Sequence, residues 1–373
     1  MIHLQDIIGQ QEATGRLRTC LAADRMPHAF LFAGPDGVGR ETTALALAAL
    51  LLCESPQTDL AGQRTACGSC QSCRLIAGGN HPDVHRIYKE LARYHENADI
   101  RNRKMQSLGI EVIRSFLLAP AGRASTQGQG KVFIVLETEL LTIEAQNSML
   151  KILEEPPPKT TIILVCGKAD MLLPTTRSRC ALIRFGALPH DFVIEKLAAA
   201  EVQPTEAAFW AAFTDGSVGG ALDHAAAGLY DIKCDILGRL AALGPAGDVT
   251  LGESLATTSD TLAEAEVKRI KKSAGADLAK TLATRRAAAV MLQLIAAAYR
   301  DAMTVATGAE RVLINADQAA AVADLADRHS PDQIAEILQQ LSRYERLLWR
   351  NVAAKTVWDN VVLTCASAAT LNV

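Results

Sequence analysis

The pattern of apolar and polar residues divides the chain into two halves. In the first half, short apolar or alternating runs each predict a β-strand, and stretches with helical spacing separate them. Strands that alternate with helices predict a parallel sheet covered on both faces, so we expect an α/β fold there. The predicted strands are residues 29–33, 83–89, 131–137, 161–165 and 181–185.

Two helices of this first half have clear boundaries in the sequence. The Ala/Leu-rich stretch 41–52 predicts a helix directly after the first strand. The stretch 142–155 predicts another helix, which opens at Thr142 and carries its apolar residues at helical spacing. Prolines at 156–158 end this helix, because proline lacks the backbone N–H that a helix interior requires.

The second half shows no strand signal after about residue 186. Residues 189–228 predict roughly three short helices, broken at Pro204 and at the stretch 215–220, which contains three glycines. Longer Ala/Leu-rich helices are predicted from residue 229 onward, with breaks at 243–248, 306–308 and 330–332.

Composition restricts the classes of protein that fit. The formal net charge is −3, which argues against a chain that binds DNA through an overall positive charge. We see no signal peptide in the first residues and expect no membrane span. Nine cysteines without such a signal favour thiols or metal ligands over disulfides, so we expect a soluble cytoplasmic protein. The polar, charge-mixed segment 89–107 predicts a solvent-exposed loop region, and the alternative is a surface that contacts a partner protein.

The stretch GPDGVGRET, residues 34–42, resembles a phosphate-binding loop. In such a loop, glycines let backbone N–H groups curl around phosphates, Lys reaches the β/γ-phosphates and Ser/Thr holds Mg²⁺. Gly34 and Gly39 occupy the two glycine positions of the motif, and Gly37 is a third glycine in the loop. The loop also follows a predicted strand and precedes a predicted helix, which is the setting the motif requires.

The residues that should do chemistry in this loop are replaced. Arg40 stands where Lys is expected and Glu41 where Ser/Thr is expected, and Thr42 comes one residue late. In the third predicted strand, Leu136 occupies the first position of the acidic pair that would hold Mg²⁺, and only Glu137 remains. These changes predict a chain that does not hydrolyse ATP. Weak nucleotide binding stays open, and the simplest interpretation is a glycine-rich turn kept for its shape.

Cysteine spacing is the strongest chemical signal. Cys53 is followed after a gap by CGSCQSC, which supplies Cys67, Cys70 and Cys73. Four thiolates fill the tetrahedral sphere of Zn²⁺, so such a zinc would be structural. The alternatives are a redox-active C-x-x-C pair or incidental buried thiols. We interpret His81 as a loop residue, since four cysteines are already available.

An arginine-containing stretch, TRSRC at 176–180, precedes the last predicted strand. An arginine at the edge of a sheet is ordinarily a surface cation. In a ring ATPase it can instead reach the nucleotide site of the neighbouring subunit, where it neutralises charge on the γ-phosphoryl group.

Together these stretches resemble the delta-prime family of bacterial DNA polymerase III clamp-loader subunits, in the AAA+ superfamily. The resemblance runs in order over about residues 1–185. It rests on DIIGQQEA, PHAFLFAGPDGVGR, CGSCQSC, NHPD, NSMLKILEEPPP and RSRC. The segment 89–107 matches no motif of this family that we identify.

This resemblance implies a fold, a cofactor and partners. It implies a P-loop NTPase-like AAA+ core over 1–185 with a zinc module at 53–73, a helical lid over 186–228 and a helical collar over 229–373. It implies a ring with delta and gamma/tau subunits, and through that ring the sliding clamp and primer–template DNA. The core would bind structural Zn²⁺ and would not bind ATP productively.

The resemblance also implies roles for single residues. Arg179, in the stretch Ser178–Cys180, would be an arginine finger acting on an adjacent subunit, and the four cysteines named above would be the zinc ligands. Gly219 stands where active relatives carry a nucleotide-sensing arginine.

Three hypotheses follow. The first is a non-hydrolysing stator that stimulates a neighbour's ATPase during clamp loading on primed DNA. The second is an active gamma/tau-like ATPase that uses Arg40 in place of Lys, and the third is a freestanding zinc-bearing AAA+ protein acting elsewhere on nucleic acid. The combined departures at Arg40, Glu41, Leu136 and Gly219 favour the first.

Overall fold

The computed structural model describes residues 3–23, 26–59, 62–101, 107–244, 249–274, 279–350 and 352–367. The chain forms two compact units. Unit 1 consists of Met1–Phe192 and Asp215–Gly220, and unit 2 consists of Val193–Thr214 and Ala221–Val373. The predicted separation of a lid from a collar stays a prediction.

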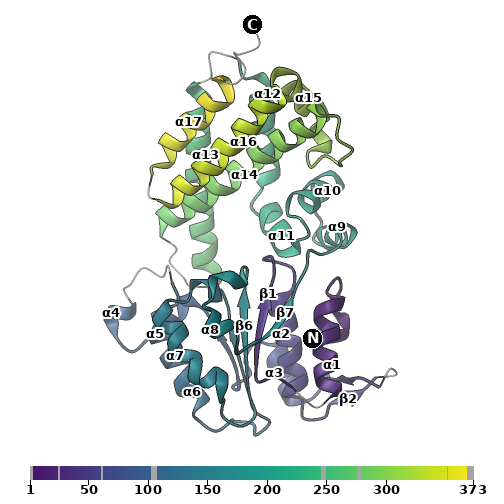
Figure 1. Cartoon of the computed structure of the whole chain (residues 1–373), viewed down its shortest axis with the longest axis vertical. Helices are drawn as coiled ribbons and strands as arrows, with labels where there is room; N and C mark the ends of the chain where they lie inside the picture. The colour runs from purple at the N-terminus through teal and green to yellow at the C-terminus, as the bar shows by residue number, and fades with distance from the viewer. Residues whose placement is uncertain are drawn as a thin grey trace. The chain divides into compact units, whose positions relative to one another are not determined.

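A five-stranded parallel sheet is the centre of unit 1 (Figure 1). Its strands, in spatial order, are β4 (Val84–Ile87), β5 (Lys131–Val135), β6 (Thr160–Cys166), β1 (Ala29–Ala33) and β7 (Ala181–Arg184). Every residue of β1 and β5 is buried, as expected of strands covered on both faces. All five predicted strands and the parallel arrangement are confirmed.

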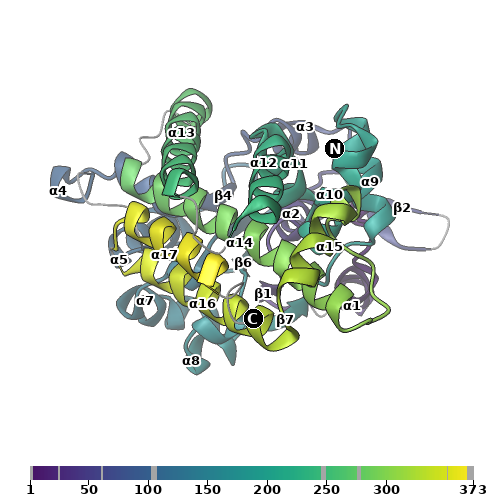
Figure 2. The same cartoon turned by 90° about the horizontal axis from the view of Figure 1, so that it is seen from above.

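Helices lie on both faces of this sheet. Figures 1 and 2 show α1 and α2 on one side and α5 and α7 on the other. The helices of unit 1 are α1 (Gln11–Ala22), α2 (Arg40–Leu51), α3 (Gln71–Ala77), α4 (Ala98–Arg101), α5 (Ile110–Ile113), α6 (Ala119–Ala121), α7 (Ile143–Glu154) and α8 (Pro174–Arg177).

The helix α7 shows how the sequence sets its own boundaries. The Thr142 side chain accepts a hydrogen bond from the backbone N–H of Ala145 at 3.2 Å, so it caps the first turn. Met149 and Leu153 are fully buried against the sheet core. The helix ends at Glu154, two residues before the prolines, as predicted.

Two parts of unit 1 differ from expectation. A small antiparallel pair, β2 (Gln57–Thr58) and β3 (Arg64–Thr65), lies between Cys53 and Cys67 and was not predicted. The segment 89–107 is not wholly solvated, because Lys89 is buried at 7% exposure in a 3₁₀ helix over Lys89–Tyr94. Tyr94 is exposed, and residues 102–106 lie outside the described residues.

Unit 2 is helical in its described residues. Its helices are α9 (His190–Ala199), α10 (Pro204–Phe213), α11 (Val218–Ala226), α12 (Leu229–Ala242), α13 (Val249–Ala274), α14 (Lys280–Ala306), α15 (Ala319–Arg328), α16 (Pro331–Trp349) and α17 (Ala354–Ser367), of which α9 and α11 begin within unit 1. The predicted breaks near 306–308 and 330–332 are confirmed, whereas residues 245–248 of the third lie outside the described residues. The expected break at 215–220 is shorter than predicted, because Gly219 and Gly220 lie inside α11.

The core of unit 2 forms around α14, which packs between α13, α15 and α16. Among the described residues, α14 is the one helix with the length and apolar composition of a membrane span. Its most apolar window is 61% buried within the unit, and Ile295 in that stretch is fully covered. A buried core helix of this kind explains the apolar composition.

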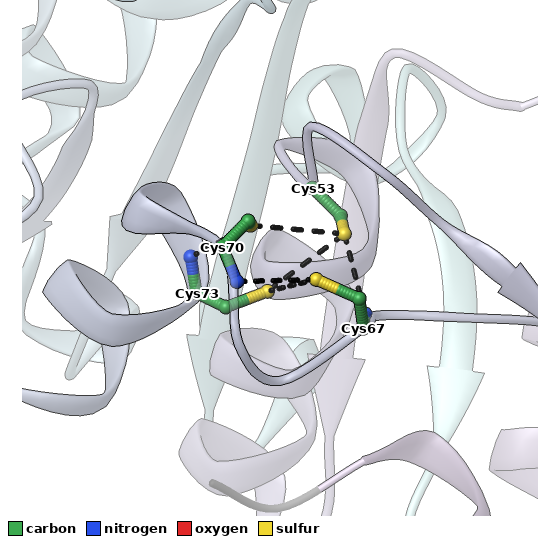
Figure 3. A group of neighbouring side chains, drawn as sticks. All are labelled: Cys53, Cys67, Cys70 and Cys73. Atoms are coloured by element: carbon green, nitrogen blue, oxygen red, sulfur yellow. Dashed lines mark hydrogen bonds between the residues drawn. The ribbon is translucent and has the colours of Figure 1, made fainter.

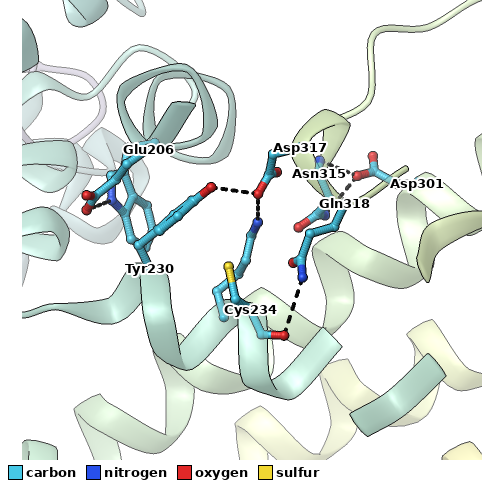
Figure 4. Close-up of polar contacts among 9 residues, drawn as sticks. Glu206, Tyr230, Cys234, Asp301, Asn315, Asp317 and Gln318 are labelled. Carbon is cyan, nitrogen blue, oxygen red and sulfur yellow. Dashed lines mark hydrogen bonds and ion pairs between the residues drawn. The ribbon is translucent and has the colours of Figure 1, made fainter. Parts of the chain in front are cut away.

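Buried polar groups connect helices of unit 2 (Figure 4). The ammonium of Lys233, on α12, pairs with Asp317 and lies 4.3 Å from the centre of the Phe209 ring on α10. Tyr230 donates a hydrogen bond to the same carboxylate at 2.8 Å. Lys233 is only 2% exposed, so this cation depends on its carboxylate and aromatic neighbours for stabilisation.

Candidate functional site

The loop between β1 and α2 has the strand–loop–helix setting and the glycines expected of a phosphate-binding loop. Gly34 follows β1, and a Cβ at this position would collide with the carbonyl oxygen of Phe185, so no larger residue fits there. Gly37 and Gly39 have φ of +73° and +95°, conformations that side chains rarely adopt. The glycines therefore keep the strand–loop–helix geometry that the sequence predicts.

The space beside Gly37 is already filled by the start of α11. The backbone N–H of Gly219 donates to the carbonyl of Gly37 at 3.2 Å. A Cβ on Gly37 would lie 2.9 Å from the Gly219 nitrogen and would collide with the Ser217 hydroxyl. Gly219 thus lies directly against the loop, where its lack of a side chain permits close packing.

The replaced loop residues are paired within the chain. Arg40 is 8% exposed, and its guanidinium forms an ion pair with Asp36, four residues earlier. Glu41 forms an ion pair with Arg86 on β4. Thr42 is half-buried, and the neighbouring Thr43 donates its hydroxyl hydrogen to the Gly39 carbonyl at 2.8 Å.

The end of β5 carries the second part of this region. Leu136 follows the strand, and Glu137 adopts a left-handed backbone with φ of +50°. The Glu137 carboxylate is paired with the buried ammonium of Lys89. Burial, and secondarily the charge of Glu139, raise the pKa of the Cys166 thiol at the end of β6 to about 11, so this cysteine is a neutral thiol at pH 7.

Arg179 lies between α8 and β7, away from the loop residues in sequence but on the same unit. Its guanidinium pairs with Glu154 at the end of α7, and its Nη1 donates to the carbonyl of Thr175 at 2.9 Å. The side chain is 28% exposed, so part of it reaches the surface of unit 1.

The four predicted cysteine ligands come together at one point (Figure 3). Their sulfur atoms all lie within 4.8 Å of one another, and all four thiols are free of disulfides. The sulfur separations are 3.8 Å for Cys53–Cys73 and 4.0 Å for both Cys53–Cys70 and Cys67–Cys73. A tetrahedron with metal–sulfur bonds of about 2.3 Å has edges of about 3.8 Å. The cluster therefore has the donor set and spacing to hold a metal ion.

Backbone N–H groups support these sulfurs. Cys67 donates to the sulfur of Cys53 at 3.3 Å, and Cys70 donates to the sulfur of Cys67 at 3.3 Å. Backbone donors from Ser69 and Cys70 lower the pKa of the Cys67 thiol to about 6, whereas burial raises the pKa of Cys73. Such N–H···S contacts favour thiolates, which are the form that binds metal.

His81 lies outside this sulfur cluster and forms hydrogen bonds with Ser72 and Asp83 instead. Its Nε2 is 2.9 Å from the hydroxyl oxygen of Ser72 in α3, and its Nδ1 accepts the backbone N–H of Asp83 at 3.1 Å. Asp83 in turn accepts backbone N–H groups of Thr126 and Gln127. Asp83 was not predicted as a structural residue, although it belongs to the NHPD motif.

Two family models match the sequence. The model described as "DNA polymerase III, delta subunit" matches residues 9–189, and the model of its C-terminal part matches residues 265–354. The first match contains the loop, the cysteine cluster and Arg179.

The curated relatives are also DNA polymerase III subunits. A DNA polymerase III subunit delta' of Escherichia coli is 31% identical over 228 residues, covering 61% of this chain and 63% of the relative. The delta' subunit of Bacillus subtilis is 31% identical over 199 residues, 53% of this chain and 54% of the relative. A gamma/tau subunit of Mycobacterium tuberculosis is 33% identical over 184 residues, 49% of this chain and 28% of the relative.

Solved structures are more distant. A gamma subunit-related protein of Thermotoga maritima aligns over 95% of this chain and 99% of its own, at 15% identity with a TM-score of 0.41. The chain spans between half and two thirds of the length of the two delta' relatives. From the family models and these relatives, the chain belongs to the clamp-loader subunit family of DNA polymerase III, and within it resembles the delta' subunits.

Proposed function

We propose that this chain is a non-hydrolysing, delta'-like stator of the clamp loader that supplies Arg179 to a neighbouring ATPase subunit. The observation that carries the proposal is the internal pairing of the charged residues in the altered loop region. Arg40 pairs with Asp36, Glu41 with Arg86 and Glu137 with Lys89.

This pairing opposes ATP hydrolysis for a physical reason. Hydrolysis requires a cation on the β/γ-phosphates, ligands for Mg²⁺ and a group that orients the attacking water. The guanidinium of Arg40 is already paired with the Asp36 carboxylate, and the carboxylate of Glu137 is already paired with the Lys89 ammonium. A nucleotide would also have to displace the packing of α11 against Gly37.

The same unit offers Arg179 as a group that can act on another subunit. An arginine that reaches a neighbour's γ-phosphate neutralises the charge that develops in the transition state, an effect of about 10³–10⁵ in rate. The Arg179 side chain is 28% exposed at the surface of unit 1, and such a role requires part of it to be accessible. The proposed partners are the delta and gamma/tau subunits, and through them the sliding clamp and primer–template DNA in the cytoplasm.

We also propose that Cys53, Cys67, Cys70 and Cys73 hold a structural Zn²⁺. Zinc bound by four thiolates supplies cross-linking of the surrounding segments and leaves no coordination position for water or substrate. The support is the all-sulfur donor set and the sulfur separations near 3.8 Å.

The alternative is an active gamma/tau-like ATPase. It is favoured by the 33% identity to gamma/tau subunits over about half of this chain. An active enzyme would need Arg40 to leave Asp36 and bind phosphate, and the pairing described above opposes this step.

Arg179→Ala tests the stator proposal in the assembled clamp loader. We expect hydrolysis at the neighbouring site to fall by about 10³-fold, and the DNA-stimulated ATPase of the complex to fall with it, because the finger's charge is lost. Arg177→Ala is a matched control, since Arg177 is two residues away and pairs only with the exposed Asp170 among the described residues. Equal ATPase rates for both variants and the unaltered complex would show that Arg179 is not the finger.

A further inference from the structure

We propose that Glu154 is a positioning residue for Arg179. Its carboxylate holds the guanidinium at the unit surface so that the outer N–H groups face an adjacent subunit. This inference rests on the proposed function, because it concerns the same arginine.

The contacts of Arg179 define which part of the guanidinium is presented. Nη2 is committed to Glu154, and Nη1 to the carbonyl of Thr175 at 2.9 Å. Nε is buried and has no hydrogen-bond partner among the described residues. A guanidinium has five N–H groups, so one further hydrogen on each Nη remains for an outside acceptor. The two acceptors of this chain thus hold the inner side of the group and leave its outer edge for phosphate oxygens.

Glu154 is suited to this task because its backbone is fixed. It is the last residue of α7, which is capped by Thr142 at its start and anchored by the buried Leu153 next to Glu154. Arg179 comes from a different segment, so the pair joins the end of α7 to the turn between α8 and β7. A long arginine side chain without such a partner would distribute over many rotamers.

The pair contributes little to stability, which makes a positioning role separable from a structural one. The Glu154 carboxylate is 52% exposed, and exposed ion pairs have small effects on folding. A small displacement of a catalytic group, in contrast, has a large effect on rate. Loss of the carboxylate is therefore expected to change catalysis while leaving the fold and assembly intact.

The neighbouring pair Arg177–Asp170 supplies a matched control. It has the same chemistry, lies two residues from Arg179 and is also exposed, with Asp170 at 96%. Removal of the Asp170 carboxylate changes the local charge by the same amount as removal of the Glu154 carboxylate but leaves the Arg179 contacts in place.

The experiment measures steady-state ATPase of the full complex with delta, gamma/tau, clamp and primed DNA. We expect Glu154→Ala to lower kcat by about 10-fold and to leave KM for ATP within about twofold, since ATP binds to the neighbour's own loop. Glu154→Gln keeps an acceptor oxygen, so its kcat should stay within about threefold of the unaltered complex. Asp170→Ala should have no effect. An unchanged or raised kcat for Glu154→Ala would overturn the inference.

Two further variants separate this inference from the proposed function. If Glu154 acts through the arginine, Glu154→Ala combined with Arg179→Ala is no slower than Arg179→Ala alone. A large loss for Arg179→Ala without any loss for Glu154→Ala would leave the proposed function standing and remove the positioning role. No loss for Arg179→Ala would remove the proposed function itself. Size-exclusion chromatography of each complex checks that assembly is unchanged, and Glu154→Ser, which also removes the carboxylate, replaces Glu154→Ala in these comparisons if the latter fails to assemble.

Discussion

At the scale of single residues, Asp83 connects the cysteine cluster to the sheet. It is 2% exposed, and its carboxylate accepts backbone N–H groups from Thr126 at 2.7 Å and Gln127 at 2.8 Å. Its own N–H donates to His81, which contacts Ser72 within α3. One continuous set of hydrogen bonds therefore joins the cysteine segment to the loop that precedes β5.

Asp83→Ala removes a buried acceptor and leaves two backbone N–H groups without it. We expect unfolding free energy to fall by about 2–4 kcal/mol, since hydrogen bonds to a charged acceptor are among the stronger ones. Urea unfolding followed by circular dichroism measures the change. Asp99→Ala, at an exposed position of α4, should unfold like the unaltered chain. A midpoint for Asp83→Ala equal to that of this control would contradict the role assigned to Asp83.

At the scale of elements, α12 carries a buried cation that joins three segments of unit 2. Lys233 faces the Phe209 and Tyr230 rings and pairs with Asp317, in the 3₁₀ helix Ala316–Gln318 that precedes α15. Removal of one member of a buried pair leaves an uncompensated charge, which is more damaging than removal of both.

Lys233→Met is expected to destabilise the chain by about 3–5 kcal/mol, because Asp317 is then buried without its cation. The double variant Lys233→Met with Asp317→Leu should recover much of that loss. Lys280→Met serves as the control, since the Lys280–Glu264 pair of the same unit is exposed and should give no measurable change. Thermal unfolding of the four proteins tests this order. A double variant less stable than the Lys233 single variant would contradict it.

We expect the cysteine segment to depend on its proposed metal more than on its packing. Its elements β2, β3 and α3 are two, two and seven residues long, too short to be stable alone. We expect a strong chelator to release one equivalent of zinc and to lower the melting temperature, because metal binding is part of the folding free energy of such a segment.

Cys73→Ser should reproduce the effect of the chelator, since it removes one of the four donors. Cys234→Ser, which changes a cysteine of α12 outside the cluster, should retain the metal. Metal content by atomic absorption and the melting temperature are measured together. Full metal retention by Cys73→Ser would contradict a four-cysteine site.

The sequence predicts elements best where its signals are local. The strands, the α2 and α7 helices and the cysteine cluster follow from apolar runs, caps, prolines and C-x-x-C spacing. The strands β2 and β3 are too short to show an alternation of apolar and polar residues. Gly219 predicts a helix break from its sequence, although it lies inside α11. Glu137–Lys89 and Glu41–Arg86 join residues far apart in sequence, so no local pattern predicts these ion pairs.

At the scale of the whole molecule, unit 1 contains two features with different accessibility: the loop between β1 and α2, whose charged residues are paired inside the chain, and Arg179, whose side chain reaches the surface. The loop keeps its glycines in left-handed conformations between a strand and a helix, and its charged residues Arg40 and Glu41 form ion pairs within the chain. Arg179 keeps a partly exposed side chain. A subunit built in this way would contribute to catalysis only through a neighbour, which fits the membership of the chain in a family of multi-subunit clamp loaders.

Steady-state ATP hydrolysis is the most direct test of this account. The purified chain is measured alone, and then with delta, gamma/tau, sliding clamp and primed DNA. We predict no turnover by the chain alone, and a turnover of the mixture that depends strongly on this chain and on Arg179. Robust hydrolysis by the chain alone, abolished by Arg40→Ala, would show that the altered loop is an active nucleotide site and would contradict the account.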